Sequence, residues 1–136
     1  MGFEKFGRKS FTAMTKTGKF VDFLVEGKIE GSVCKKCGVK YFPPRADCAS
    51  CLSPEMDWFD MPAKGKLETF TTAYYAPFGF EADPPYTMGV VDFGTIKLFA
   101  RLAKEIPIDQ IAVGMDVGIR TLKYDDGQMS FEITKA

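Results

Sequence analysis

The second half of the chain alternates apolar and polar positions in short runs, a pattern that predicts β-strands. The runs cover residues 66–76, 86–93, 95–103, 117–124 and 128–134. A turn or short helical bridge over 106–115 separates the third run from the fourth. Five strands with such a bridge match the OB-fold, a small Greek-key barrel, and its long first loop would be APFGFEADPPY, residues 76–86.

Two of these runs also predict which side chains share a face. The positions expected together are Leu67, Thr69, Thr71 and Ala73 in the first run, and Ile96, Leu98, Ala100 and Leu102 in the third. The second and third runs meet near Asp92 and Gly94, so they predict a hairpin. The last two runs flank Asp125, Asp126 and Gly127, which suit a tight hairpin turn.

In the first part of the chain, the apolar residues of one segment recur with the period of a helix. In residues 17–28, TGKFVDFLVEGK, the residues Phe20, Phe23, Leu24 and Gly27 recur at spacings of three and four. Thr17 is a candidate N-cap and Gly27 a candidate C-cap, so this segment predicts a short amphipathic helix.

Farther upstream, four apolar side chains lack a clear period. They are Phe3, Phe6, Phe11 and Met14. A segment so near a terminus has little chain of its own to pack against. These side chains either fold back on the core or are covered by another subunit, and both interpretations stay open.

Two C-x-x-C pairs ten residues apart hold all four cysteines of the chain, in CKKCGVKYFPPRADCASC. Each pair places two thiolates on one side of a tight turn, and two such turns complete a tetrahedral site suited to zinc. The predicted ligands are Cys34, Cys37, Cys48 and Cys51. Two disulfides, a redox-active pair and an iron site are the alternatives. Four thiolates leave no position for an activated water, so the zinc would be structural.

Composition excludes several classes of function. The 136 residues include 18 Lys plus Arg and 18 Asp plus Glu, so no net charge attracts nucleic acid or acidic membranes. No apolar run approaches the length of a membrane span, and we expect a soluble, cytoplasmic protein. Histidine is absent and every cysteine is committed to metal, so neither a Cys–His pair nor a Ser–His–Asp triad can form. Independent catalysis is therefore not expected.

A ribbon followed by an OB barrel resembles the acyl-CoA-associated zinc-ribbon/OB-fold family. The resemblance covers nearly the whole chain and lies in FVDFLVEGKIEGSVCKKCGVKYFPPRADCASC, GKLETFTTAYYAPFGF and PYTMGVVDFGTIKLFARL. It implies a mainly β fold: an N-terminal helical arm (1–30), a rubredoxin-like zinc ribbon (31–62) and a five-stranded OB-fold domain (63–136). Members are small accessory subunits of thiolases, hydroxymethylglutaryl-CoA synthases or related aldolases. In these complexes the thiolase-like partner chain holds the catalytic Cys and His.

The resemblance also implies contacts with the partner chain and with acyl-CoA. The candidate contacts for coenzyme A or the acyl group are Lys40, Tyr41, Phe42, Arg45, Phe78 and Phe80. The basic residues could bind the phosphates of coenzyme A, and the aromatic residues could stack on its adenine. Alternatively, the basic residues only keep the ribbon soluble and the aromatic residues only pack beside the metal. Candidate docking residues are Phe20, Phe23 and Leu24.

A single-stranded nucleic-acid-binding protein is the alternative function, because OB-folds and zinc ribbons both bind single strands through basic grooves and aromatic platforms. The balanced charge of the chain argues against it, since the few lysines near the cysteines would have to act alone.

Overall fold

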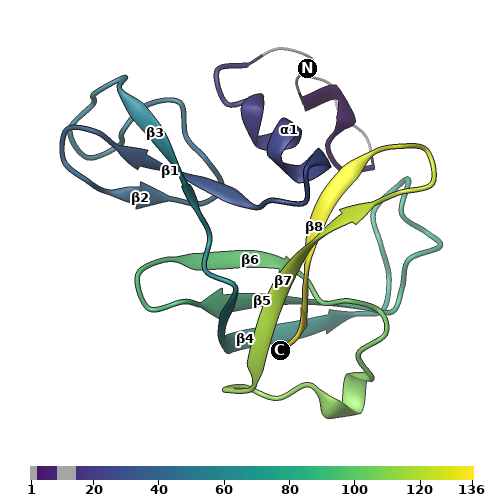
Figure 1. Cartoon of the computed structure of the whole chain (residues 1–136). Helices are drawn as coiled ribbons and strands as arrows, with labels where there is room; N and C mark the ends of the chain where they lie inside the picture. Colours follow the sequence, from purple (N-terminus) through teal and green to yellow (C-terminus); the bar gives the residue numbers. More distant parts are fainter. Residues whose placement is uncertain (1–2, 9–14) are drawn as a thin grey trace. The chain divides into compact units, whose positions relative to one another are not determined.

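A computed structural model describes residues 3–8 and 15–136. The expectations for Phe11 and Met14 lie outside these residues. In chain order the elements are η1 (Phe3–Lys5), α1 (Lys19–Val25), β1 (Glu30–Cys34), β2 (Lys40–Tyr41), β3 (Met56–Asp60), β4 (Lys64–Ala73), β5 (Tyr86–Asp92), β6 (Lys97–Arg101), η2 (Ile108–Gln110), β7 (Asp116–Lys123) and β8 (Met129–Lys135) (Figure 1). The chain is thus mainly β with one short α-helix among the described residues, as predicted.

Packing groups the chain into two units. The first comprises the residues up to Met61 together with Arg120–Phe131, and the second comprises Pro62–Ile119 with Glu132–Ala136. The tip of the β7–β8 hairpin therefore belongs with the ribbon and the helix, whereas the three-part division expected from the sequence assigned it to the barrel. That division stays a prediction.

In the first unit, β1 is the central strand of a three-stranded antiparallel sheet in the order β2-β1-β3. Ser32 pairs with Tyr41 on one side and with Trp58 on the other. Gly31 is required in β1, because a Cβ there would lie 2.6 Å from the Tyr41 carbonyl oxygen and 2.8 Å from the Phe59 ring. This close approach lets β2 and β3 flank the strand that delivers the first cysteine.

Helix α1 begins one residue later than the sequence predicted. Gly18 is the N-cap and no side chain caps the helix, so the prediction for Thr17 is wrong. The expected glycine end is confirmed: Gly27 has φ +83° directly after the C-cap. Its N–H donates to the Leu24 carbonyl at 3.0 Å, and the Lys28 N–H donates to the Phe23 carbonyl at 2.8 Å. These two bonds form a Schellman motif, which satisfies carbonyls at the helix end.

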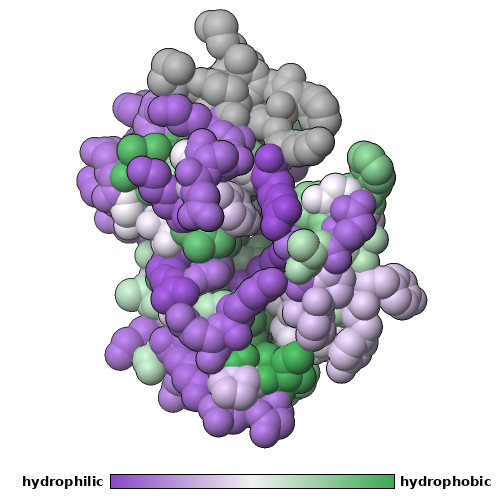
Figure 2. Space-filling view, turned by 90° about the vertical axis from the view of Figure 1, so that its right-hand side faces the viewer, coloured by the Kyte–Doolittle hydropathy of each residue, from purple (hydrophilic) through white to green (hydrophobic). Residues whose placement is uncertain are grey.

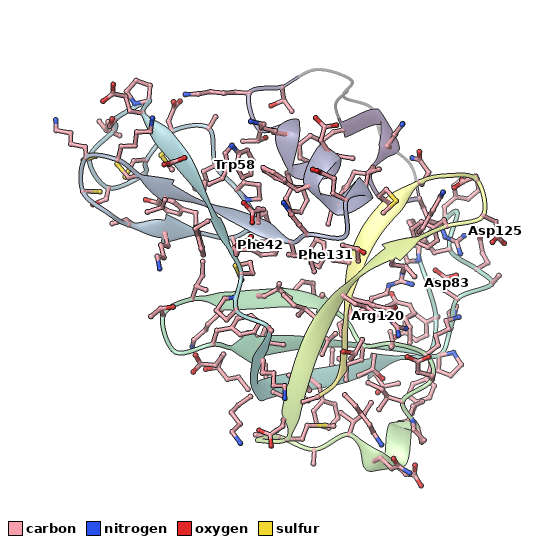
Figure 3. All side chains as sticks on the ribbon, viewed as in Figure 1. Phe42, Trp58, Asp83, Arg120, Asp125 and Phe131 are labelled. Atoms are coloured by element: carbon pink, nitrogen blue, oxygen red, sulfur yellow. The ribbon has the colours of Figure 1, made fainter. Side chains whose placement is uncertain are left out.

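An aromatic cluster fills the core of the first unit. Phe20 of α1 is 1% exposed, and its ring lies 5.8–6.0 Å from four other rings. Those rings belong to Phe3, Phe6, Phe42 and Phe131. Phe42 and Phe131 point toward one another, with ring centroids 5.2 Å apart (Figure 3). Phe3 and Phe6 thus fold back on their own chain.

The second unit carries most of a five-stranded sheet in the order β6-β5-β4-β7-β8. A parallel bridge between Leu102 and Ile133 brings the end of β6 to β8, so the sheet is a nearly closed barrel. The residues at its core are at most 1% exposed: Leu67, Val91, Leu98, Val117 and Ile133. The predicted five strands, the hairpin of β5 and β6, and the bridging turn η2 are confirmed.

One predicted face is wrong in the first barrel strand. The pairing of β4 with β5 shifts between Leu67 and Thr69, which marks a β-bulge. An extra residue reverses the side-chain alternation beyond it. Leu67 therefore points into the core while Thr69 and Thr71 are exposed.

Candidate metal centre

The first C-x-x-C pair lies in the turn that joins β1 to β2. Cys34 is the last residue of β1, and the chain turns back so that the Cys37 N–H donates to the Cys34 Sγ at 3.4 Å. The Gly38 N–H donates to the Cys34 carbonyl at 2.9 Å, with Gly38 at φ +78°. A glycine adopts this left-handed conformation at little cost, which explains its place directly after the second cysteine.

The second pair repeats this geometry between β2 and β3. The Cys51 N–H donates to the Cys48 Sγ at 3.5 Å, and the Leu52 N–H donates to the Cys48 carbonyl at 3.0 Å. Leu52 takes the role of Gly38 and is the one non-glycine residue of the described chain with positive φ, at +63°. Leu52 was not predicted to be special, although it follows the second C-x-x-C pair directly, as Gly38 follows the first.

The four sulfurs fit one tetrahedral metal ion. All four Sγ atoms lie within 4.8 Å of one another, and two pairs, Cys34–Cys51 and Cys37–Cys48, are 3.6 Å and 3.5 Å apart. Zinc bound by thiolates at about 2.3 Å has sulfur–sulfur edges of roughly 3.8 Å. A disulfide would require about 2.05 Å, and all four cysteines are free thiols. The predicted zinc site is confirmed, and the disulfide alternative does not fit.

The pKa values of the cysteine thiols also indicate that a bound cation is needed to ionise all four. A hydrogen bond with the Tyr41 hydroxyl, 3.4 Å from the sulfur, lowers the pKa of Cys48 to about 6. The Val39 amide lowers the pKa of Cys37, but this is outweighed by the neighbouring thiols, foremost Cys48, and by desolvation, which together raise it to about 12. Like charges this close cannot all ionise unaided, whereas a bound Zn²⁺ deprotonates coordinating thiols.

The metal centre is therefore a structural zinc site. Four protein thiolates fill the coordination sphere of a tetrahedral ion and leave no position for water or substrate. Two ligands are buried and two are partly or fully exposed, so the site lies at the surface of the ribbon.

The left-handed backbone conformation of Leu52 is expected to cost stability. Leucine in the left-handed region is strained by about 1 kcal/mol relative to glycine. Because the Leu52 side chain is 80% exposed, its removal loses little packing. Leu52→Gly is therefore expected to stabilise the zinc-loaded protein by up to about 1 kcal/mol in chemical denaturation. Leu52→Ala, which shortens the side chain but keeps the strain, is the matched control; an equal gain in both variants would contradict the backbone explanation.

Two of the aromatic residues proposed to contact coenzyme A, Tyr41 and Phe42, have partners within the first unit. The Tyr41 hydroxyl contacts the Cys48 sulfur and accepts a hydrogen bond from the Ala49 N–H, so Tyr41 supports the second knuckle. Phe42 belongs to the aromatic cluster. Both are half-buried, which supports a packing role beside the metal more than stacking on adenine.

The two basic candidates remain exposed. Lys40 lies over the Phe59 ring, with Nζ 5.0 Å from its centroid, and the Arg45 guanidinium lies over the Tyr41 ring at 5.4 Å. Both charged groups thus make cation–π contacts within the ribbon while the side chains stay accessible to solvent.

The loop between β4 and β5 carries strongly exposed aromatic side chains. Phe78 is 93% exposed, Tyr75 87% and Tyr74 70%. Figure 2 shows a face of the molecule on which pale and green side chains interrupt a largely purple, polar surface. Phe80 is half-buried, because the Arg101 guanidinium lies 5.8 Å from its ring.

A partly buried ion pair, not anticipated from the sequence, anchors this loop. The Asp83 side chain is 6% exposed and accepts a hydrogen bond from the Arg101 guanidinium at 2.9 Å. Arg101 also stacks on Tyr86 at 4.1 Å. Figure 3 labels Asp83 on the β4–β5 connection. The end of the loop next to β5 is thus anchored, whereas the aromatic side chains of its first half are exposed.

The structure corrects the docking hypothesis for helix α1. Phe20 is 1% exposed and Leu24 is fully buried, so these side chains form the core of their own unit and are not available to a partner. Phe23 is half-buried against Trp58, with ring centroids 5.4 Å apart. The periodicity found the apolar face correctly, but that face packs inward.

Comparison with known proteins agrees with this architecture. Residues 22–57 match the family model described as the ChsH2 rubredoxin-like zinc ribbon domain, and residues 58–122 match the ChsH2 C-terminal OB-fold domain. A DUF35 domain-containing scaffold protein of Methanocaldococcus jannaschii is 30% identical over 109 residues, which cover 74% of this chain and 75% of that protein. The benzoylsuccinyl-CoA thiolase subunit BbsA of Thauera aromatica is 32% identical over 75 residues, covering 54% of this chain and 51% of BbsA.

Solved structures share the fold. The structure titled Ltp2-ChsH2(DUF35) aldolase superposes with a TM-score of 0.76 at 20% identity, covering 92% of this chain and 98% of the other. A DUF35 protein of unknown function from Sulfolobus solfataricus gives a TM-score of 0.59 at 21% identity, covering 88% and 85%. The zinc ribbon and OB-fold segments of this chain both match family models, and a relative at 30% identity is covered over three quarters of its length. The chain therefore belongs to the DUF35 family.

Proposed function

We propose that this chain is a non-catalytic accessory subunit that binds a thiolase-superfamily enzyme and helps to form its acyl-CoA binding region. The observation that carries the proposal is the closed four-thiolate centre in a chain without histidine. The metal has no open position for chemistry, and the cysteines that could act as nucleophiles are its ligands. The catalytic groups would then belong to the partner chain.

The names of relatives support the same proposal. BbsA is named as a thiolase subunit, one solved neighbour is titled as an aldolase containing a DUF35 chain, and the Methanocaldococcus jannaschii relative is named a scaffold protein. We extend that role to this chain, with a hetero-oligomer in the cytoplasm as the assembly. No helix in the described part of the chain is long and apolar enough to cross a membrane.

The exposed first half of the β4–β5 loop, residues 74–78, is the surface we assign to the partner or to the acyl group. Large aromatic side chains are costly to leave in water, and Tyr and Phe are enriched at interface hot spots. Phe78 and Tyr75 offer this surface, whereas Phe80 is half-buried with the Arg101 guanidinium 5.8 Å from its ring. Lys40 and Arg45, exposed on the ribbon, are the basic side chains that would meet coenzyme A phosphates.

Replacing Phe78 tests this assignment. Because the side chain is 93% exposed, Phe78→Asp should leave folding and zinc content unchanged. If Phe78 is an interface hot spot, losing it costs about 2 kcal/mol or more, so affinity for the thiolase-superfamily chain should fall by about 30-fold. The tagged protein is purified from its native cells, its partner is identified by mass spectrometry, and affinity is measured with the purified pair.

Val113→Asp is the matched control, because Val113 is 67% exposed and lies outside the loop. A loss of affinity in both variants, or in neither, would contradict the loop assignment. A chain that copurifies with no thiolase-superfamily protein would overturn the proposed function itself. Salt-sensitive retardation of a single-stranded oligonucleotide would instead favour the nucleic-acid alternative.

A further inference from the structure

The barrel unit contains a pocket with no role in the proposed function. Its volume is about 330 Å³, and it lies between the end of the β4–β5 connection and the segment from β6 to η2. This volume is near the lower end of the range of about 300–1,000 Å³ found for small-molecule pockets. All residues that line it belong to the second unit.

The buried lining of the pocket is largely aliphatic. Leu102, Ala103, Ile106 and Ile111 are 2–8% exposed, and two polar residues, Asp83 and Thr87, are each 5% exposed. The Thr87 hydroxyl is satisfied by Thr72 at 2.9 Å. Within the described residues, no buried side-chain polar atom lacks a hydrogen-bond partner. The polar side chains of Thr87 and Asp83 already bind Thr72 and Arg101, so the buried part of a ligand would meet mainly aliphatic side chains and should be apolar.

A positively charged side chain, that of Lys104, lies at the rim of the pocket. Lys104 is exposed and lines the pocket, and its Nζ donates to the Asp83 main-chain carbonyl at 3.2 Å. The nearby Asp83 carboxylate is bound by Arg101. Over residues 3–8 and 15–136, Lys104 takes part in no ion pair. Its positive charge is free to attract an anion at the mouth of the pocket.

We propose that this pocket binds a small amphipathic anion, a linear alkyl carboxylate, with its hydrocarbon chain against the aliphatic lining and its carboxylate facing Lys104. The lining offers a single aromatic side chain, Tyr86, and is otherwise built largely of proline and branched aliphatic residues. Such walls suit a narrow alkyl chain. The proposal concerns the barrel alone and does not depend on a thiolase partner.

Octanoate titrated into the full-length, zinc-loaded protein tests the site by two-dimensional NMR. Saturable amide shifts should map to residues 84–87 and 102–111, with a dissociation constant on the order of 1 mM, because a short alkyl chain gains little beyond the cost of immobilisation. Lys104→Gln should weaken octanoate binding about fivefold, as expected for a partly exposed ion pair. Lys64→Gln removes an exposed lysine of the same unit that does not line the pocket, and should change nothing.

A neutral ligand and a blocked pocket complete the test. 1-Octanol should bind more weakly than octanoate and should not respond to Lys104→Gln. Ile108 is 43% exposed at the rim, so Ile108→Trp should obstruct the mouth without disturbing the core and reduce octanoate affinity at least tenfold. Equal binding of octanol and octanoate would show a purely apolar site, such as one for a protein side chain, and would overturn the proposal. Shifts outside the pocket, or none up to 10 times the expected constant of about 1 mM, would also overturn it.

Discussion

Chelation of zinc is expected to unfold the first unit. A structural zinc ion contributes about 10–16 kcal/mol of apparent binding free energy, which matches or exceeds the whole stability of a typical domain, about 5–15 kcal/mol. Purified protein should carry one zinc per chain by elemental analysis, because its four free thiols form one site. Without the ion, four thiols must stay close together without a shared ligand.

The single tryptophan reports this change. Trp58 lies on β3, pairs with Ser32 of β1 in register and packs its ring on Phe23. A strong chelator should shift Trp58 emission to longer wavelength as the ring becomes hydrated, and excess zinc should reverse the shift. Cys34→Ser should reproduce the chelated state, whereas Ser50→Ala, an exposed substitution inside the second knuckle, should not. Metal-free protein with an unchanged melting curve and emission maximum would contradict a structural role for the ion.

Strands β5 and β6 of the barrel were predictable because one face of each is buried. Strand β6, Lys97–Arg101, alternates exposed and buried positions, and its inner residues Leu98 and Ala100 are at most 7% exposed. The burial pattern of β5 alternates in the same way. Alternation with period two is directly visible in a sequence, so the bounds were predicted within a few residues. The bulge after Leu67 was not, because nothing in KLETF marks an extra residue.

The strands of the ribbon were hidden for a different reason. In β1, Glu30, Gly31, Ser32 and Cys34 are all buried, so the strand shows neither alternation nor an apolar run. Its stability comes from pairing on both sides and from local bonds such as the Arg45 N–H to the Ser32 Oγ, 2.9 Å apart. The metal ligands were predictable because their chemistry depends on spacing, whereas the surroundings of Phe20 depend on rings more than twenty and more than one hundred residues away.

The interior position of Phe20 leads to the second large effect. Truncating a buried phenylalanine removes its transfer free energy and leaves a cavity, at a typical cost of 3–5 kcal/mol. Phe20 is 1% exposed and contacts four aromatic rings, so Phe20→Ala should fall within this range in denaturant unfolding of the zinc-loaded protein. Its zinc stoichiometry should stay at one when folded, because no ligand is changed.

Val25→Ala on the same helix is the matched control. Val25 is 57% exposed, so the substitution should change the free energy of unfolding by no more than about 0.5 kcal/mol. The comparison separates core packing from docking, because a residue that serves only a partner would weaken assembly when replaced and leave the isolated chain as stable as before. If Phe20→Ala behaved in that way, the aromatic cluster would not be the core of the unit, and the docking role first read from the helical period would be restored.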